Sequence, residues 1–125
     1  MTHYTSPTVE QKSDQGVAVW RLLGDWSRDL PLELRHGVVA NLLGEVQEAL
    51  VLDLRDVRFI DSWGEEVLCD AIQRQTEEGK RVCWTLDATR TARFHGVIRA
   101  LERRHVEALH YPNTIEAMAA VRGAR

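Results

Sequence analysis

The sequence predicts one α/β domain, a mixed and mostly parallel central sheet with about four helices. Two observations lead to this prediction. Short apolar runs of strand length alternate along the chain with longer segments whose apolar residues recur at helical spacing. The resulting order, β-β-α-β-α-β-α-β-α, is typical of parallel strands joined by helices. At 125 residues, the chain also has the length of a single domain, which we expect to span residues 1–125.

The stretch from Ala49 to Ile72 is the centre of the predicted fold. We expect a buried strand at Leu50–Leu54, a turn over Arg55–Asp61 and a helix that opens at Ser62. The apolar side of this helix follows helical spacing and consists of Gly64, Val67, Leu68, Ala71, Ile72 and Gln75. Asp61 and Ser62 therefore fall at a helix N-terminus, beside the C-terminal end of a central strand. Ligands and partners of open α/β sheets usually dock at that edge.

The N-terminal part is expected to supply two strands. Residues 1–7 are polar and predicted to be disordered, and Thr8–Lys12 reads as an edge strand. A turn at Ser13–Gly16 leads to a strand at Val17–Leu23. This strand alternates, so that one face carries Val17, Val19 and Arg21 while the other carries Ala18, Trp20 and Leu22.

A loop at Gly24–Pro31 precedes the first predicted helix, Leu32–Val46. Ser27 or Asp29 is expected to cap this helix, with Pro31 near its first turn. Its predicted buried stripe is Leu34, Val38, Val39, Leu42, Leu43 and Val46.

The C-terminal half repeats the alternation of strands and helices. The helix from Ser62 is expected to run to about Glu78, with Gly79 ending it. We then expect four elements in turn: a buried strand at Arg81–Leu86, a helix capped by Asp87 or Thr89 that runs to about Arg104, a strand at Val106–Tyr111 and a helix at Ile115–Val121.

Composition narrows the range of functions. A net charge of −3 argues against a nucleic-acid binder held by phosphate contacts. Cys69 and Cys83 form neither a CxxC pair nor a disulfide framework, so we expect buried thiols in a reducing cytoplasm. The N-terminus lacks the basic and apolar regions of a signal peptide, and no apolar run approaches the length that spans a membrane. We therefore expect a cytoplasmic protein without direct membrane insertion.

Motifs of catalysis are missing from the sequence. It contains neither a GxGxxG nor a GxxxxGK[ST] phosphate loop, and neither HExxH nor GxSxG. The five histidines are scattered, and the carboxylates form no spaced acid–base pair. No metal ion or cofactor is expected, and a small enzyme or nucleotide binder is the weakest functional hypothesis.

The segment Phe59-Ile60-Asp61-Ser62-Trp63-Gly64, placed between an apolar strand and a helix, resembles the corresponding motif of STAS domains, the domain of bacterial anti-sigma factor antagonists. The resemblance covers nearly the whole chain. It takes in the strand ending at Leu23-Gly24, the Leu50–Leu54 strand, the Gly79–Val82 segment and a final helix near Thr114.

The resemblance implies a phosphorylation-regulated interaction module that is not an enzyme. In that family the hydroxyl residue directly after the motif's Asp is the phosphoacceptor, which falls on Ser62. A serine kinase that is also the anti-sigma factor modifies it, and the dephosphorylated domain binds this kinase and frees the sigma factor. Other relatives act in stressosome assemblies. A further group are cytoplasmic subunits of lipid-transport ABC systems, so an ABC ATPase is the alternative partner. The oligomeric state stays open, a homodimer included.

The resemblance also implies a partner-binding surface around Ser62, formed by Asp61, Trp63, Gly64, Glu65, Glu66, Asp25 and Ser27. Three departures from the family pattern affect it. Glu65 and Glu66 replace the Leu and Gly that often follow the motif. Ser27 stands where many antagonists have an Asp in the first loop, a role that Asp25 or Asp29 could take. Trp63 occupies a position that is often Ser or Thr and is aromatic in some stressosome relatives.

Two residues of the motif keep two interpretations each. Ser62-Trp63-Gly64-Glu65 also fits a capping box, in which Ser62 accepts from the Glu65 N–H and Glu65 reaches back to the Ser62 N–H. This structural role is compatible with modification, because a cap hydroxyl at a surface helix end is accessible. Trp63 either flanks the helix's apolar stripe or is an exposed anchor for a partner.

Overall fold

The computed structural model describes residues 4–46, 48–86 and 92–123. Its strands form one five-stranded sheet in the order β1-β2-β3-β4-β5, in which β1 is antiparallel to β2 and the other neighbours are parallel. The strands are β1 (Thr8–Asp14), β2 (Val17–Trp26), β3 (Ala49–Ile60), β4 (Arg81–Thr85) and β5 (Leu109–Tyr111). The helices are α1 (Leu32–Leu42), α2 (Ser62–Glu77), α3 (His95–Arg103) and α4 (Thr114–Gly123). The α/β fold class and the mostly parallel sheet are thus confirmed.

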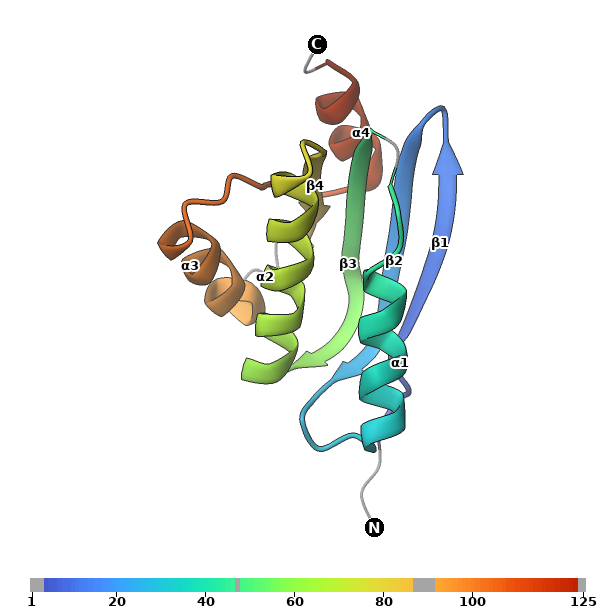
Figure 1. The fold of residues 1–125 in the computed structure, drawn as a ribbon, viewed down its shortest axis with the longest axis vertical. Helices are drawn as coiled ribbons and strands as arrows, with labels where there is room; N and C mark the ends of the chain where they lie inside the picture. Colours follow the sequence, from blue (N-terminus) through green and yellow to red (C-terminus); the bar gives the residue numbers. More distant parts are fainter. Residues whose placement is uncertain (1–3, 47, 87–91, 124–125) are drawn as a thin grey trace.

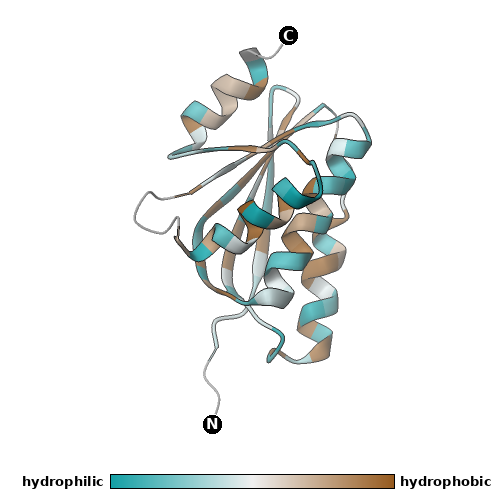
Figure 2. Cartoon of the chain, turned by 90° about the vertical axis from the view of Figure 1, so that its left-hand side faces the viewer, coloured by the Kyte–Doolittle hydropathy of each residue, from teal (hydrophilic) through white to brown (hydrophobic). Residues whose placement is uncertain are grey.

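The helices divide between the two faces of the sheet. In Figure 1 and in the side view of Figure 2, α1, α2 and α3 lie on one side and α4 lies on the other. The larger apolar core is under the three helices and includes Trp20, Leu52 and Ile72. A smaller core under α4 includes Val51 and Cys83. Burial of these apolar side chains on both faces is the main favourable term for this arrangement.

The two faces of β2 separate as its alternation predicts. Trp20 and Leu22 are buried in the core under the three helices, whereas Val17 packs in the core under α4. Both cysteines are buried free thiols, one in each core, as expected from their spacing.

The central strand is longer than predicted. Residues Arg55–Asp61 were expected to turn the chain, but β3 continues to Ile60 and leads directly into α2. Two charged side chains in this extension form ion pairs. Arg55 pairs with Asp53 in the same strand, and Asp56 pairs with Arg21 of the neighbouring β2. Val57, the residue after Asp56, is buried in the core. The pair between Arg21 and Asp56 joins β2 to β3, and this contact with another element is not visible in the local sequence.

The segment from β2 to α1 also differs from the prediction. The strand runs on to Trp26, and α1 has Pro31 as its N-cap residue with no side-chain cap from Ser27 or Asp29. The helix ends at Leu42 rather than Val46, and Leu43 is exposed instead of buried. Gly44, a weak helix former, follows this end closely.

Helix α2 begins and ends close to the predicted residues. Gly79 adopts a left-handed backbone with φ of 83° directly after the last turn. Its N–H donates to the Thr76 carbonyl at 3.0 Å, and the Lys80 N–H donates to the Gln75 carbonyl at 3.0 Å. This pair of bonds is a Schellman motif, which satisfies carbonyls that the helix leaves open.

The remaining differences are at element ends. Strand β1 extends to Asp14, β5 covers only Leu109–Tyr111, and α3 starts at His95 with Phe94 as N-cap residue. The expected caps Asp87 and Thr89 lie outside the described residues. Disorder of residues 1–7 stays a prediction; among the described residues before β1, the Thr5 N–H donates to Asp25 Oδ2 at 2.9 Å.

The described residues contain neither a helix that could span a membrane nor a cluster of metal-binding side chains. Within them, every helix is too short or too polar to cross a bilayer. The same residues contain no group of three His, Cys, Asp or Glu side chains arranged to hold a metal ion.

Candidate functional site

The site forms where the C-terminal ends of β2 and β3 meet the start of α2. Asp61 is the N-cap residue of α2, with extended backbone and a side-chain Oδ1 that accepts from the Gly64 N–H at 3.1 Å. Ser62 is the first residue inside the helix. The predicted capping box, with Ser62 as the cap, is therefore wrong. Both residue types are good caps, and tertiary contacts of Asp61 decide between them.

Those contacts involve the second oxygen of the same carboxylate. Asp61 Oδ2 accepts from the Arg28 N–H at 2.8 Å and from the Ser27 hydroxyl at 3.2 Å. The Asp61 N–H in turn donates to the Trp26 carbonyl at 3.2 Å. One side chain thus caps α2 and also fastens the loop that connects β2 to α1.

This environment keeps Asp61 ionised. Burial, the largest single influence, would raise the pKa of the Asp61 carboxyl. The hydrogen bonds from the N–H groups of Arg28 and Gly64, together with the Ser27 hydroxyl, outweigh burial and lower the pKa below its usual value. A negative charge therefore sits at the positive end of α2.

Gly64 allows the helix start to approach the sheet. A Cβ at this position would lie 2.5 Å from the Trp26 carbonyl oxygen and 2.8 Å from Ile60 Cγ1. Only glycine fits such a contact without a shift of the backbone. The glycine of the motif is thus required for the close packing of α2 against the ends of β2 and β3.

The Ser62 side chain is exposed. Its hydroxyl makes no hydrogen bond to any part of the chain that the structure describes. The N-terminus of a helix stabilises anions through its unpaired N–H groups and its dipole. A phosphate on this hydroxyl would consequently project into solvent from a position that tolerates negative charge.

Trp63 has features of both predicted roles, a side chain that flanks the core and an anchor exposed to a partner. Its ring is half-buried and packs against the main core, and the Arg35 guanidinium carbon lies 5.8 Å from the ring centroid. Trp63 also lines a surface groove of about 290 Å³, together with residues of α1 such as Leu32 and with the exposed Leu43 just after α1. An apolar surface therefore begins one residue after Ser62.

The two glutamates of the motif differ in position. Glu66 is exposed, as a residue that meets a partner would be. Glu65 is half-buried and lies against the first turn of α3, since a Cβ on Gly96 would fall within reach of both of its carboxylate oxygens. This position suits a carboxylate, because the N-terminal end of α3 is positive. Glu65 of α2 therefore packs against the start of α3.

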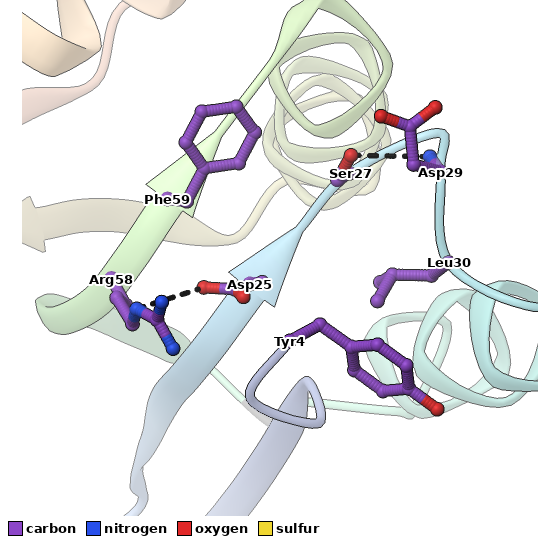
Figure 3. Close-up of a pocket in the computed structure, with 7 residues that line it drawn as sticks. All are labelled: Tyr4, Asp25, Ser27, Asp29, Leu30, Arg58 and Phe59. Carbon is purple, nitrogen blue, oxygen red and sulfur yellow. Dashed lines mark hydrogen bonds and ion pairs between the residues drawn. The ribbon is translucent and has the colours of Figure 1, made fainter. Parts of the chain in front are cut away.

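Asp25 and Ser27, predicted as partner-binding residues, are both buried. They line a cavity of about 320 Å³ beside the helix start, with Tyr4, Asp29, Leu30, Arg58 and Phe59 (Figure 3). The sequence reading missed Arg58 and Phe59, because it placed them in a turn. Recognition that β3 continues past Leu54 would have brought them next to Asp25, which is paired with Phe59 across the two strands.

Three solved structures resemble this chain over nearly its full length. An anti-sigma factor antagonist from Mycobacterium paratuberculosis matches with a TM-score of 0.70 and 21% identity over 94% of this chain and 95% of its own. The anti-sigma factor antagonist SpoIIAA in its unphosphorylated form has a TM-score of 0.58 and 13% identity, over 94% and 99%. The protein TM1081, solved by NMR, has a TM-score of 0.55 and 20% identity, over 98% and 94%.

These likenesses confirm the fold that the resemblance implied, the α/β fold of anti-sigma factor antagonists. No protein-family model and no curated protein sequence matches the chain.

Proposed function

We propose that this protein is a phosphorylation-regulated interaction module, an anti-sigma factor antagonist or stressosome-like regulator that binds a serine kinase acting as an anti-sigma factor. The observation that carries the proposal is the exposed Ser62 hydroxyl, on the first residue of α2 and directly after a carboxylate cap. The proposed phosphoacceptor is Ser62, and the proposed contact surface consists of Glu66, the outer side of Trp63 and the neighbouring β2–α1 loop.

The fold supports this proposal. Two of the structures that share it are anti-sigma factor antagonists, and one of these was solved in an unphosphorylated form. A relative with a phosphorylated and an unphosphorylated state is what a switch at Ser62 requires. Asp25 and Ser27 are buried, so the proposal gives them the role of supporting the contact surface from beneath.

Electrostatics explains how the switch would work. A phosphoryl group adds about −1.5 to −2 charges and three acceptor oxygens. It would stand beside the Asp61 carboxylate and the exposed Glu66, so a partner surface shaped for a neutral hydroxyl would meet a concentrated negative charge. Repulsion and unmet desolvation would then weaken the complex without unfolding the domain.

The test is phosphate incorporation by the serine kinase from the native host, measured by intact mass. Wild type is expected to gain one phosphate and Ser62→Ala none. Ser13→Ala is the matched control, because Ser13 is an exposed serine in β1 far along the chain from the site. An unmodified wild type, in a reaction where the kinase modifies its control substrate, would contradict the proposal.

A pull-down of the kinase is a second test of the proposal. Ser62→Asp is expected to retain less kinase than wild type in a pull-down from the native host, whereas Ser13→Asp should retain as much. An ABC ATPase captured equally by wild type and Ser62→Ala would instead support the alternative, a cytoplasmic subunit of a lipid-transport system.

A further inference from the structure

The cavity beside Ser27 has the size and the chemistry of a small-ligand site. It opens at the C-terminal ends of β2 and β3, next to Tyr4, and has a volume of about 320 Å³. Pockets for small molecules usually measure roughly 300–1,000 Å³. The proposed phosphorylation of Ser62 does not use this cavity.

Asp25 supplies a buried acceptor that lacks a hydrogen bond. Its side chain is only 9% exposed. Oδ2 accepts from the Thr5 N–H at 2.9 Å, while Oδ1 accepts no hydrogen bond and its nearest cation, Arg58 Nε, is 3.7 Å away. Buried carboxylate oxygens are nearly always hydrogen-bonded, because an unsatisfied one costs free energy. The Asp25 carboxylate, whose Oδ1 is closed off from solvent, therefore adds a negative charge to the wall of the cavity.

Charges of both signs line the cavity. Figure 3 shows Arg58 next to Asp25 on one side and the Asp29 carboxylate on the other. The Arg58 side chain is 61% exposed, and its Nη1 donates to Thr5 Oγ1 at 2.6 Å. A guanidinium has five N–H donors, so Arg58 can still bind an anionic group. A simple cation would be repelled by Arg58, and a simple anion by the two aspartates.

Apolar groups complete the lining. Phe59 and Tyr4 are large residues that remain 50% and 41% exposed at the cavity, and Leu30 closes it from the direction of α1. Their rings offer surface to an aliphatic or aromatic body of the size of one amino-acid side chain.

We propose that this cavity binds a small zwitterion of the class of free α-amino acids with an apolar side chain. The ammonium group pairs with the carboxylates of Asp25 and Asp29, the ligand carboxylate binds Arg58, and the side chain packs against the apolar lining. Each charged group of the ligand thus meets a group of opposite charge.

The site adjoins the proposed switch but does not depend on it. Ser27 lines the cavity, and its hydroxyl donates to Asp61, the cap residue next to Ser62. Binding can therefore be measured on the unmodified full chain, whether or not Ser62 is ever phosphorylated.

The experiment is isothermal titration calorimetry of the wild-type protein with L-leucine, isoamylamine and isocaproate. The last two are leucine without its carboxylate and without its ammonium group. Leucine is expected to bind saturably, and each half-analogue at least about tenfold more weakly, because each loses one charge-assisted interaction. The other common amino acids are then compared with leucine to rank the side chains.

Substitutions of residues that line the cavity test whether leucine binds there. Arg58→Gln and Asp25→Asn should each weaken leucine binding about tenfold or more, whereas Arg99→Gln and Glu107→Gln, exposed charges on and after α3, should leave it unchanged. Arg58 is a surface side chain, so its variant stays folded even if Asp25→Asn does not.

Three results would overturn the proposal: no amino acid binds to the folded wild type, a half-analogue binds as tightly as leucine, or Arg58→Gln binds leucine normally. If free amino acids do not bind but Arg58→Gln loses partner capture, the cavity belongs to a protein interface, and the proposal is also wrong.

Discussion

At the scale of single residues, Asp61 has two roles, because its two carboxylate oxygens bind different elements. Replacement by Ala would remove the cap of α2, worth about 1 kcal/mol, and would leave the Ser27 and Arg28 donors without their acceptor. We expect a total loss of about 1–3 kcal/mol in the free energy of unfolding. Asp61→Asn, which keeps one acceptor oxygen, should lose about half as much. Urea denaturation of these variants beside Glu33→Gln, an exposed carboxylate on α1, measures the difference. Equal stability of Asp61→Ala and wild type would contradict these roles.

The stability of the protein should depend on pH through two aspartates, Asp53 and Asp61. Burial would raise the pKa of Asp53, but hydrogen bonds from Arg55 and the Thr85 hydroxyl outweigh it, so the pKa is lowered, as it is for Asp61. A lowered folded pKa stabilises the protein above the unfolded value of about 3.9, and this stability is lost as the pH falls through the folded value.

We therefore expect the free energy of unfolding to fall steeply below about pH 5. Asp61→Asn should be less sensitive to acid than wild type, whereas Glu33→Gln should follow the wild-type curve. Denaturation curves at several pH values test this, and parallel curves for Asp61→Asn and wild type would show that Asp61 does not contribute.

At the scale of elements, the joint between α2 and the sheet depends on a missing side chain. Gly64→Ala would press a methyl group against the Trp26 carbonyl and Ile60, at a cost of about 1–3 kcal/mol. Gly37→Ala is the matched control. A Cβ there meets no atom within 4 Å in the middle of α1, so the better helix former should stabilise the protein by about 0.5–1 kcal/mol. Thermal melts of the two variants should shift in opposite directions, and a shift in the same direction would refute the packing account.

The same scale shows why sequence reading succeeds for some elements and fails for others. The ends of α2 carry local signals, Asp61 at the start and Gly79 after the last turn, so both ends could be predicted. The far half of β3 carries none, because Asp56 looks like a turn residue until its ion pair with Arg21 of β2 is known. The choice of Asp61 over Ser62 as cap likewise depends on donors from the β2–α1 loop. The cavity depends on Arg58 and Phe59, so it was missed together with the strand that carries them.

At the scale of the whole molecule, the accessibility of the two cysteine thiols can be used to follow unfolding on each face of the sheet. Cys69 is in the core under α1, α2 and α3, and Cys83 is in the core under α4. Burial raises the pKa of both thiols, that of Cys83 to about 12. Since the thiolate is the reactive form, neither should be alkylated until the protein opens.

If the sheet and both layers of helices unfold together, the two cysteines become accessible in the same event. We expect alkylation of native protein, followed by peptide mass mapping, to give the same protection for Cys69 and Cys83 and the same rise in rate with urea. Protein unfolded beforehand should react rapidly at both positions. Faster labelling of Cys83 would mean that α4 detaches separately, since local opening needs less free energy than global unfolding. A common rate would mean that the Ser62 surface is carried by one cooperative unit, so that a phosphate or ligand bound there acts on the stability of the entire fold.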